Sequence, residues 1–260
     1  MLARIEEDSQ LARRITHWRR LQARPARYAD YPAGIDPRLV EALRARGIER
    51  PYSHQALGID AALRGENVVV ITPTASGKTL CYNAPVLNRL LADPTARALY
   101  LFPTKALAQD QMAELQALVA AIQSAAGTPA QRGGAVVVAT YDGDTPQGQR
   151  PRIRREASIV ISNPDMLHQG ILPHHTRWAT FFRGLRFVVV DEMHTYRGVF
   201  GSHVANVLRR LKRVCAFYGA SPQFVCASAT IGNPLDLAER LVEERFFLVD
   251  ADQDLSLIHI

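Results

Sequence analysis

The chain has 260 residues, of which 47% are hydrophobic and 22% are charged, a composition that excludes a disordered or low-complexity protein. This length allows one large α/β domain with a short extension and excludes two full domains of that size. Lys and Arg outnumber Asp and Glu by 31 to 25, a modest excess that favours a polyanionic partner, although many basic enzymes bind no nucleic acid.

Targeting signals and cysteines bear on the location and redox chemistry of the protein. Charged residues follow Met1 closely, without the apolar stretch of a signal peptide, and no later apolar run approaches membrane-spanning length. We therefore expect a cytoplasmic protein with no membrane partner. The three cysteines, Cys81, Cys215 and Cys226, form no CxxC pair, which predicts buried, reduced thiols rather than a zinc site or a disulfide framework.

Residues 1–46 are predicted to form a basic, helical N-terminal extension. Leu11, Ile15 and Trp18 form an apolar stripe at helical spacing there. Four basic side chains surround this stripe: Arg13, Arg14, Arg19 and Arg20. A solvated helix face is the favoured interpretation, and a basic groove for a nucleic-acid strand or for another domain is the alternative. A helix packed on the following domain is compatible with both.

Strand and helix signals alternate from residue 67 onward. Short β-branched runs predict six strands, at 67–71, 98–102, 135–139, 159–161, 187–190 and 224–227. Apolar residues at helical spacing predict intervening helices, most clearly over 112–122 and 204–215. The alternation predicts an α/β fold, with a mostly parallel sheet covered by helices on both faces and with ligands at the carboxyl ends of the strands.

The segment TPTASGKT, residues 72–79, lies between the first predicted strand and a predicted helix, and it resembles a phosphate-binding P-loop. Backbone N–H groups of such a loop and the positive end of the next helix stabilise phosphate oxygens. The loop residues concerned are Thr74, Ala75, Ser76 and Gly77. Lys78 is expected to reach the β- and γ-phosphates of ATP, and the Thr79 hydroxyl to bind Mg²⁺. Because Thr72 replaces a glycine of the strict pattern, a chance strand-to-helix turn is the alternative.

Two adjacent carboxylates follow the predicted strand at 187–190, in the segment Asp191-Glu192-Met193-His194. An isolated acidic pair is more often a solvated turn, but its position after the P-loop favours a DExH box. In that interpretation Asp191 holds Mg²⁺ and Glu192 polarises the attacking water as general base. His194 then links the ATP state to the other motifs.

Further segments over residues 47–234 resemble the motifs of superfamily-two helicases, in the same order. The resemblance implies a RecA-like P-loop NTPase domain, which we assign to residues 47–250, with ATP and Mg²⁺ as cofactors. It implies that Gln55 reads adenine, with Tyr52 nearby, and that Ser228 and Thr230 couple hydrolysis to domain movement. Loops gripping a nucleic-acid backbone are implied at Pro103, Thr104, Lys105, Gly143, Asp144, Asn163 and Pro164.

A closer resemblance, to the mitomycin-repair type of bacterial DNA helicase, rests on longer segments. These are TPTASGKT, LFPTKALAQDQ, TYDGDTP, NPDMLH and DEMHTYRGVFGSHVANVLRRLKR. The resemblance implies an ATP-dependent DNA helicase of DNA repair that unwinds 3′ to 5′, acting on single-stranded or duplex DNA. An RNA helicase and a translocase that does not unwind remain alternatives. A non-enzymatic binding module would not require Lys78, Asp191 and Glu192.

The carboxyl-terminal part raises two further expectations. Four cations of the predicted helix over 198–218 lie opposite its apolar face: Arg209, Arg210, Lys212 and Arg213. A solvated face is the favoured interpretation, and a basic groove is the alternative. Residues 255–260 extend no recognisable element and resemble a translated sequencing-library adapter, so we expect 251–260 to be a truncated tail. The second RecA-like domain and the four-cysteine domain of the family would then belong to a longer parent protein.

Overall fold

The computed structural model describes residues 26–72, 77–125 and 136–250. Three sets of expectations fall outside these ranges. They concern residues 1–25 of the N-terminal extension, the P-loop residues Thr74, Ala75 and Ser76, and the tail at 251–260.

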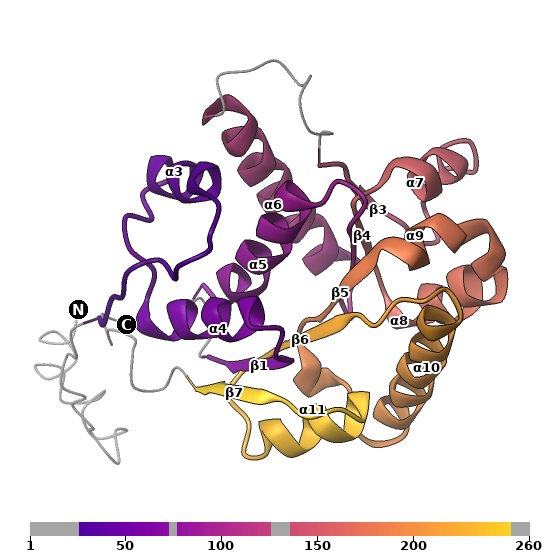
Figure 1. Ribbon diagram of the computed structural model, residues 1–260. Coiled ribbons are helices and arrows are strands. Elements are labelled where there is room, and N and C mark those ends of the chain that lie inside the picture. The colour runs from indigo at the N-terminus through magenta and orange to yellow at the C-terminus, as the bar shows by residue number, and fades with distance from the viewer. Residues whose placement is uncertain (1–25, 73–76, 126–135, 251–260) are drawn as a thin grey trace, which may run out of the picture.

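One seven-stranded sheet, in the order β3-β4-β2-β5-β6-β1-β7, organises the described chain (Figure 1). All its pairings are parallel, which confirms the α/β fold with a parallel sheet. The strands are β1 (Val68–Ile71), β2 (Arg97–Leu101), β3 (Val138–Thr140), β4 (Ile159–Ser162), β5 (Leu185–Val190), β6 (Gln223–Ser228) and β7 (Phe247–Asp250). The first six correspond to the predicted strands, although β3 begins at Val138, later than the sequence indicates. The edge strand β7 was not predicted.

Helices cover both faces of this sheet. Their bounds are α3 (Pro37–Ala45), α4 (Ser53–Leu63), α5 (Thr79–Ala92), α6 (Lys105–Ala125), α7 (Arg150–Glu156), α8 (Pro164–Met166), α9 (Ala179–Gly184), α10 (Gly198–Phe217) and α11 (Pro234–Val242). Short helical turns complete the list: η1 (Leu167–Ile171), η2 (Leu172–Trp178) and η3 (Met193–Thr195). The helices predicted over 112–122 and 204–215 are the central parts of α6 and α10.

The alternation of side chains along each buried strand divides the interior into two apolar clusters. In β1, Val68 and Val70 belong to the cluster under α3, α4, α5 and α6, whereas Val69 belongs to the cluster under α9, α10 and α11. All four β1 residues are buried, because a parallel sheet with helices on both faces leaves neither side to water.

Part of the N-terminal extension is built into this core. Leu39 and Leu43 of α3 are almost completely buried, and the Asp36 side chain caps the helix by accepting a hydrogen bond from the Arg38 N–H. The Asn88 side chain on α5 accepts a hydrogen bond of 2.7 Å from the backbone N–H of Asp36. The start of α3 is thereby fixed to the helix that follows the P-loop.

The three cysteines are buried and form no disulfide, and burial raises the pKa of the Cys81 thiol to about 12. Of the helices within 26–72, 77–125 and 136–250, none has both the length and the apolar character needed to cross a membrane.

Candidate nucleotide and nucleic-acid site

Sheet order brings three of the predicted motifs to one edge. Strands β5, β6 and β1 are neighbours and run parallel, so the DEMH segment, the Ser228–Thr230 segment and the P-loop all emerge at their carboxyl ends. The junction is hydrogen-bonded, because the Thr72 N–H donates to the Ser228 carbonyl at 3.3 Å. Ser228 itself is fully buried.

The charged side chains of the P-loop and of the DEMH segment meet at this edge. The Lys78 ammonium forms an ion pair with Glu192 and a second, at 3.3 Å, with Asp191. All three side chains are largely shielded, with 17% of Lys78, 5% of Asp191 and 21% of Glu192 exposed. Glu192 has a left-handed backbone with φ of 50°, a conformation that L-residues other than Gly, Asn and Asp rarely adopt and that clusters at functional sites.

Asp191 is the most buried carboxylate of this group. Burial raises the pKa of its carboxyl group, and the Lys78 ammonium opposes that rise only in part. One oxygen accepts the Glu192 N–H at 2.7 Å, and the other accepts the hydroxyl of Tyr82 at 2.9 Å. The carboxylate is therefore held in one orientation.

Tyr82, Gln111 and Glu114 join this site although the sequence did not single them out. Tyr82 is fully buried on α5, and its hydroxyl also lies 3.3 Å from the Gln111 amide oxygen on α6. The Thr79 hydroxyl lies 3.4 Å from a Glu114 carboxylate oxygen, also on α6. The sequence offered one signal for a role of Tyr82 at this site: its hydroxyl is a polar group one helical turn after Lys78, on an otherwise apolar helix face.

Gln55 connects α4 to the end of the P-loop. Its amide nitrogen donates to the Gly77 carbonyl and its amide oxygen accepts the Tyr52 N–H, each at 2.9 Å. Gly77 has φ of +72°, a conformation that favours glycine, and a Cβ there would come within 2.6 Å of the Gln55 amide nitrogen and displace that side chain. One N–H and one lone pair of Gln55 remain for a further partner. The Tyr52 ring stacks between Tyr28 and His54.

His194 lies between the DEMH segment and the segment after β6. Its Nδ1 accepts a hydrogen bond of 3.4 Å from the Ala229 N–H and lies 3.3 Å from a Glu192 carboxylate oxygen. A neutral ring can accept at Nδ1 from Ala229, whereas contact with Glu192 requires a proton on that nitrogen. The Ser228 hydroxyl donates to the Ala229 carbonyl at 2.8 Å, and Thr230 is exposed.

The three loops predicted to contact nucleic acid follow β2, β3 and β4, which are neighbours in the sheet. Lys105, at the start of α6, forms an ion pair with Asp144 of the loop after β3. The Ser162 hydroxyl donates to the Tyr141 carbonyl at 2.6 Å, which connects the loops after β4 and β3. Asn163 caps α8 by accepting the Met166 N–H at 2.8 Å. Pro103 is half-buried, Thr104 and Gly143 are exposed, and Pro164 is buried.

Arg150 holds the loop after β3 in its shape and was also missed by sequence reasoning. Its guanidinium donates to the Thr145 and Asp142 carbonyls, each at 3.1 Å, and lies over the Tyr141 ring. The Asp142 carboxylate accepts the N–H groups of Asp144 and Thr145. These contacts orient Gly143 and Asp144 toward solvent.

A hard divalent cation fits the residues at the nucleotide edge. The Thr79 hydroxyl and the Asp191 carboxylate are oxygen donors of the kind that Mg²⁺ prefers, with room left for water and phosphate oxygens. Within the described ranges, His, Cys, Asp and Glu side chains form no cluster of three or more that could hold a metal by themselves.

Comparison with known proteins identifies the family. A model of the DEAD/DEAH box helicase family matches residues 52–237, well over half of the chain. The chain belongs to the DEAD/DEAH box helicases. The matched range contains every described motif residue discussed above.

Individual relatives of this helicase chain are much longer than the chain itself. It is 51% identical over 236 residues to the uncharacterised ATP-dependent helicase YprA of Bacillus subtilis, covering 91% of this chain and 30% of YprA. It is 40% identical to the ATP-dependent helicase HRQ1 of Saccharomyces cerevisiae, covering 90% of this chain and 21% of HRQ1. The chain thus spans about a third or less of the length of these relatives.

Solved structures give the same assignment for the fold. A crystal structure of the DUF1998 helicase MrfA bound to DNA superimposes with a TM-score of 0.89 at 48% identity, over 98% of this chain and 33% of that chain. The DEAD-box helicase Mss116, at 19% identity, shares the fold with a TM-score of 0.68. The predicted RecA-like fold and the superfamily-two resemblance are confirmed.

Proposed function

We propose that this helicase chain is the ATP-binding motor domain of an ATP-dependent DNA helicase that hydrolyses ATP to move along and unwind DNA. One observation carries the proposal: Lys78, Asp191 and Glu192 meet at the edge of the sheet that also presents the loops at Lys105 and Asp144. A nucleic-acid motor needs a nucleotide site and a strand-binding surface on one rigid sheet, because ATP hydrolysis at the first must change the affinity of the second for the strand.

Each side chain at the nucleotide edge has a role in this proposal. Lys78 exchanges its carboxylate partners for the terminal phosphates of ATP, and Gln55 uses its remaining N–H and lone pair on adenine. Thr79 and Asp191 hold Mg²⁺, which neutralises charge on the transferred phosphoryl group when bound. Glu192 takes a proton from the attacking water. His194, between Glu192 and Ala229, transmits the nucleotide state to Ser228 and Thr230.

DNA as substrate is supported by similarity to relatives, whereas a role in DNA repair is supported only by the resemblance of the motif segments to the mitomycin-repair type of helicase. The relative MrfA was solved bound to DNA, and HRQ1 is an ATP-dependent helicase. Because the chain covers only 33% of MrfA, we propose a second RecA-like domain in a longer parent protein as the intramolecular partner. Residues 47–250 would then supply one wall of the nucleotide site and part of the strand groove, including Asn163 and Pro164.

Steady-state ATP hydrolysis, with and without single-stranded DNA, tests the proposal in both the chain and its longer parent. We expect DNA-stimulated turnover in the parent and near-background turnover in the chain, since loss of an arginine finger lowers phosphoryl transfer by about 10³- to 10⁵-fold. Glu192→Gln in each protein controls for contaminating ATPases. Absence of DNA-stimulated turnover in the parent would contradict the motor function, and robust turnover by the chain would contradict the need for a second domain.

A strand-displacement assay on the parent separates unwinding from translocation. A helicase releases the displaced strand in the presence of ATP, whereas a pure translocase hydrolyses ATP on duplex DNA without releasing it. Parallel RNA substrates test the preference for DNA. If the parent displaces strands from RNA substrates but not from DNA substrates, the proposed substrate is wrong and RNA takes its place.

A further inference from the structure

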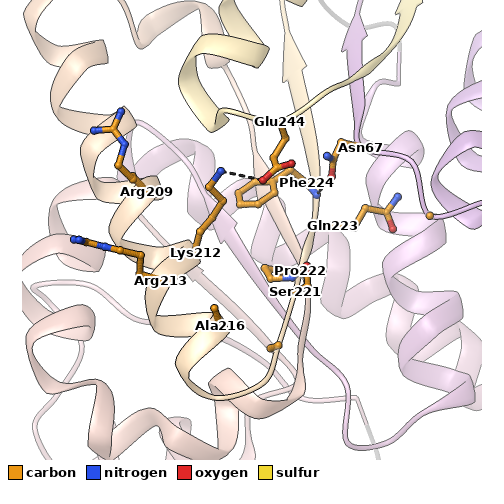
Figure 2. A pocket seen from close by; sticks show the side chains of 12 residues that line it. Asn67, Arg209, Lys212, Arg213, Ala216, Ser221, Pro222, Gln223, Phe224 and Glu244 are labelled. Atoms are coloured by element: carbon orange, nitrogen blue, oxygen red, sulfur yellow. Dashed lines mark hydrogen bonds and ion pairs between the residues drawn. The ribbon is translucent and has the colours of Figure 1, made fainter.

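The four cations of α10 fall into two groups in the structure. Arg209 forms an ion pair with both carboxylate oxygens of Glu243, at 3.0 and 2.5 Å. Lys212 forms one with Glu244 at 3.0 Å, drawn as a dashed line in Figure 2. Within the described part of the chain, Arg210 and Arg213 have no ion pair. Arg209 and Arg213 are exposed and Arg210 and Lys212 are half-buried, which is compatible with the solvated face favoured by the sequence, but the two groups differ in their ion pairs.

Arg210 and Arg213 line a groove between α10 and the segment formed by α8 and η1. The groove has a volume of about 550 Å³, and its wall includes Pro164, Asp165, His168, Phe200, Arg210 and Arg213. Pro164 adjoins Asn163, so the groove begins at the loop after β4 that is assigned to strand contact. The wall also includes Arg209, whose charge is offset by Glu243, and Asp165 is the only carboxylate that the described residues contribute to it.

An aromatic ring stands in the wall of this groove. Phe200 is 43% exposed, and its ring is supported from one side by Tyr196, with centroids 5.7 Å apart. The first turn of α10 packs closely against the backbone of Tyr196. This packing depends on Gly201, because a Cβ there would come within 2.5 Å of the Tyr196 carbonyl oxygen. The position of Phe200 is thereby fixed to the turn that follows Glu192.

We propose that this groove carries a single nucleic-acid strand onward from the loop at Asn163 and Pro164. Arg210 and Arg213 bind its phosphates, and Phe200 stacks on a base. The proposal rests on the proposed function and extends the strand path beyond the motif loops. Guanidinium groups that have no ion-pair partner among the described residues, in the wall of the same groove as an exposed aromatic ring, are a combination that binds single strands without sequence preference.

The geometry sets the length of strand concerned. Phe200 and Arg213 are 13 positions apart on α10, which corresponds to roughly 20 Å along the helix axis. At about 3.4 Å per nucleotide, a strand that follows α10 passes about six nucleotides between these two residues. An acidic protein segment is the competing occupant, but continuity with the strand loops and the exposed ring favour nucleic acid.

Fluorescence anisotropy with labelled single-stranded DNA tests the proposal on the 260-residue chain at low salt. The groove variant is Arg210→Gln/Arg213→Gln. Its matched control, Lys212→Gln/Arg240→Gln, removes the same charge from two cations that are ion-paired and lie outside the groove. Far-UV circular dichroism checks folding of both variants.

We expect oligonucleotides of about 15 nucleotides to bind the groove variant about tenfold more weakly than the control, because two charge-assisted contacts are lost. The slope of log affinity against log salt should fall by about 1.4, at about 0.7 per phosphate contact on a single strand. Lengthening the oligonucleotide from about 6 to about 15 nucleotides should strengthen binding to the wild type and the control but not to the groove variant. Equal affinities of groove variant and control, or no binding by the wild type, overturn the proposal.

A second variant reports on the groove without relying on affinity. Phe200→Trp should show fluorescence quenching when the longer oligonucleotide is added, measured against the wild-type background. Quenching supports a base against position 200, and unchanged emission from an oligonucleotide-saturated variant contradicts it. Nucleotide titration of the same preparations tests the proposed motor function separately, because the groove variants leave Lys78 and Asp191 untouched.

Discussion

Replacing Tyr82 with Phe would remove one oxygen atom from the interior of the molecule and little else. The ring is fully buried, and its hydroxyl donates to the Asp191 carboxylate at 2.9 Å. A hydrogen bond to a charged group contributes about 1.5–3 kcal/mol. For a domain of this size each kcal/mol lowers Tm by about 2–4 °C. The neighbouring Tyr100→Phe is a matched control, because Tyr100 is equally buried but donates to the neutral Asn83 amide at 3.0 Å.

The two variants should differ in pH dependence. Burial already raises the pKa of Asp191, so the folded protein holds that proton more tightly than the unfolded chain, and stability falls as pH rises through the raised pKa. Tyr82→Phe removes a hydrogen bond that favours the carboxylate, which raises the pKa further. Its loss of stability should therefore be larger at neutral pH than in acid, whereas that of Tyr100→Phe, about 0.5–1.5 kcal/mol, should not change.

The decisive measurement is a Mg²⁺ titration at a fixed concentration of fluorescent ATP analogue. Asp191 loses its orienting partner in Tyr82→Phe, and loss of a residue that orients a metal ligand typically costs about 10- to 100-fold in metal affinity. The Mg²⁺ concentration for half-maximal nucleotide binding should rise accordingly in Tyr82→Phe and stay at the wild-type value in Tyr100→Phe. Equal Mg²⁺ dependence in both variants would refute the positioning role of Tyr82.

Three further substitutions probe the nucleotide edge and the strand loops. Lys78→Ala should greatly weaken ATP binding in a folded chain and lower the free energy of unfolding by about 1–3 kcal/mol, because Asp191 and Glu192 lose their cation; wild-type affinity by nucleotide titration would show that the loop does not bind the phosphates. Glu192→Gln in the longer parent should keep nucleotide and DNA binding but nearly stop ATP turnover, and unchanged turnover would assign the base to another residue. Arg150→Ala should weaken single-stranded DNA binding by about threefold or more, because two hydrogen bonds to the loop after β3 are lost. Nucleotide binding by the same chain should stay unchanged. Unaltered DNA affinity would contradict a positioning role of Arg150.

The sequence predicts the motif loops well because parallel sheets obey a simple geometric rule. Residues that follow buried strands emerge at one edge, so Lys78, Asp191 and Ser228 could be expected together before the strand order was known. The predicted contact of His194 with other motifs has a structural counterpart in its position between Glu192 and Ala229. Which role each of these residues has in the reaction stays a prediction.

Other features depended on information that is not local in the sequence. Periodicity places Tyr82 on a buried helix face, but it does not predict that the Tyr82 hydroxyl contacts the carboxylate of Asp191, 109 positions later in the chain. Likewise, the division of the α10 cations depends on Glu243 and Glu244, more than thirty positions away along the chain from Arg209 and Lys212. Strand β7 was missed although Phe247, Leu248 and Val249 form a short apolar run; only Val249 of its four residues is buried, because β7 lies at the edge of the sheet.

The pairing of Lys78 with Asp191 and Glu192 has a consequence for how a nucleotide enters. One ammonium is shared by two carboxylates at this site, so a metal-free polyphosphate would meet an excess of negative charge. Entry together with a divalent cation would instead be an ion exchange, in which Lys78 would turn from the carboxylates to phosphate and Asp191 would help to hold the cation. The local charge balance is then largely preserved, and desolvated carboxylates are never left without a counter-ion. The protein should therefore select magnesium nucleotide over free nucleotide, and its nucleotide affinity should vary less with ionic strength than its affinity for a phosphate backbone.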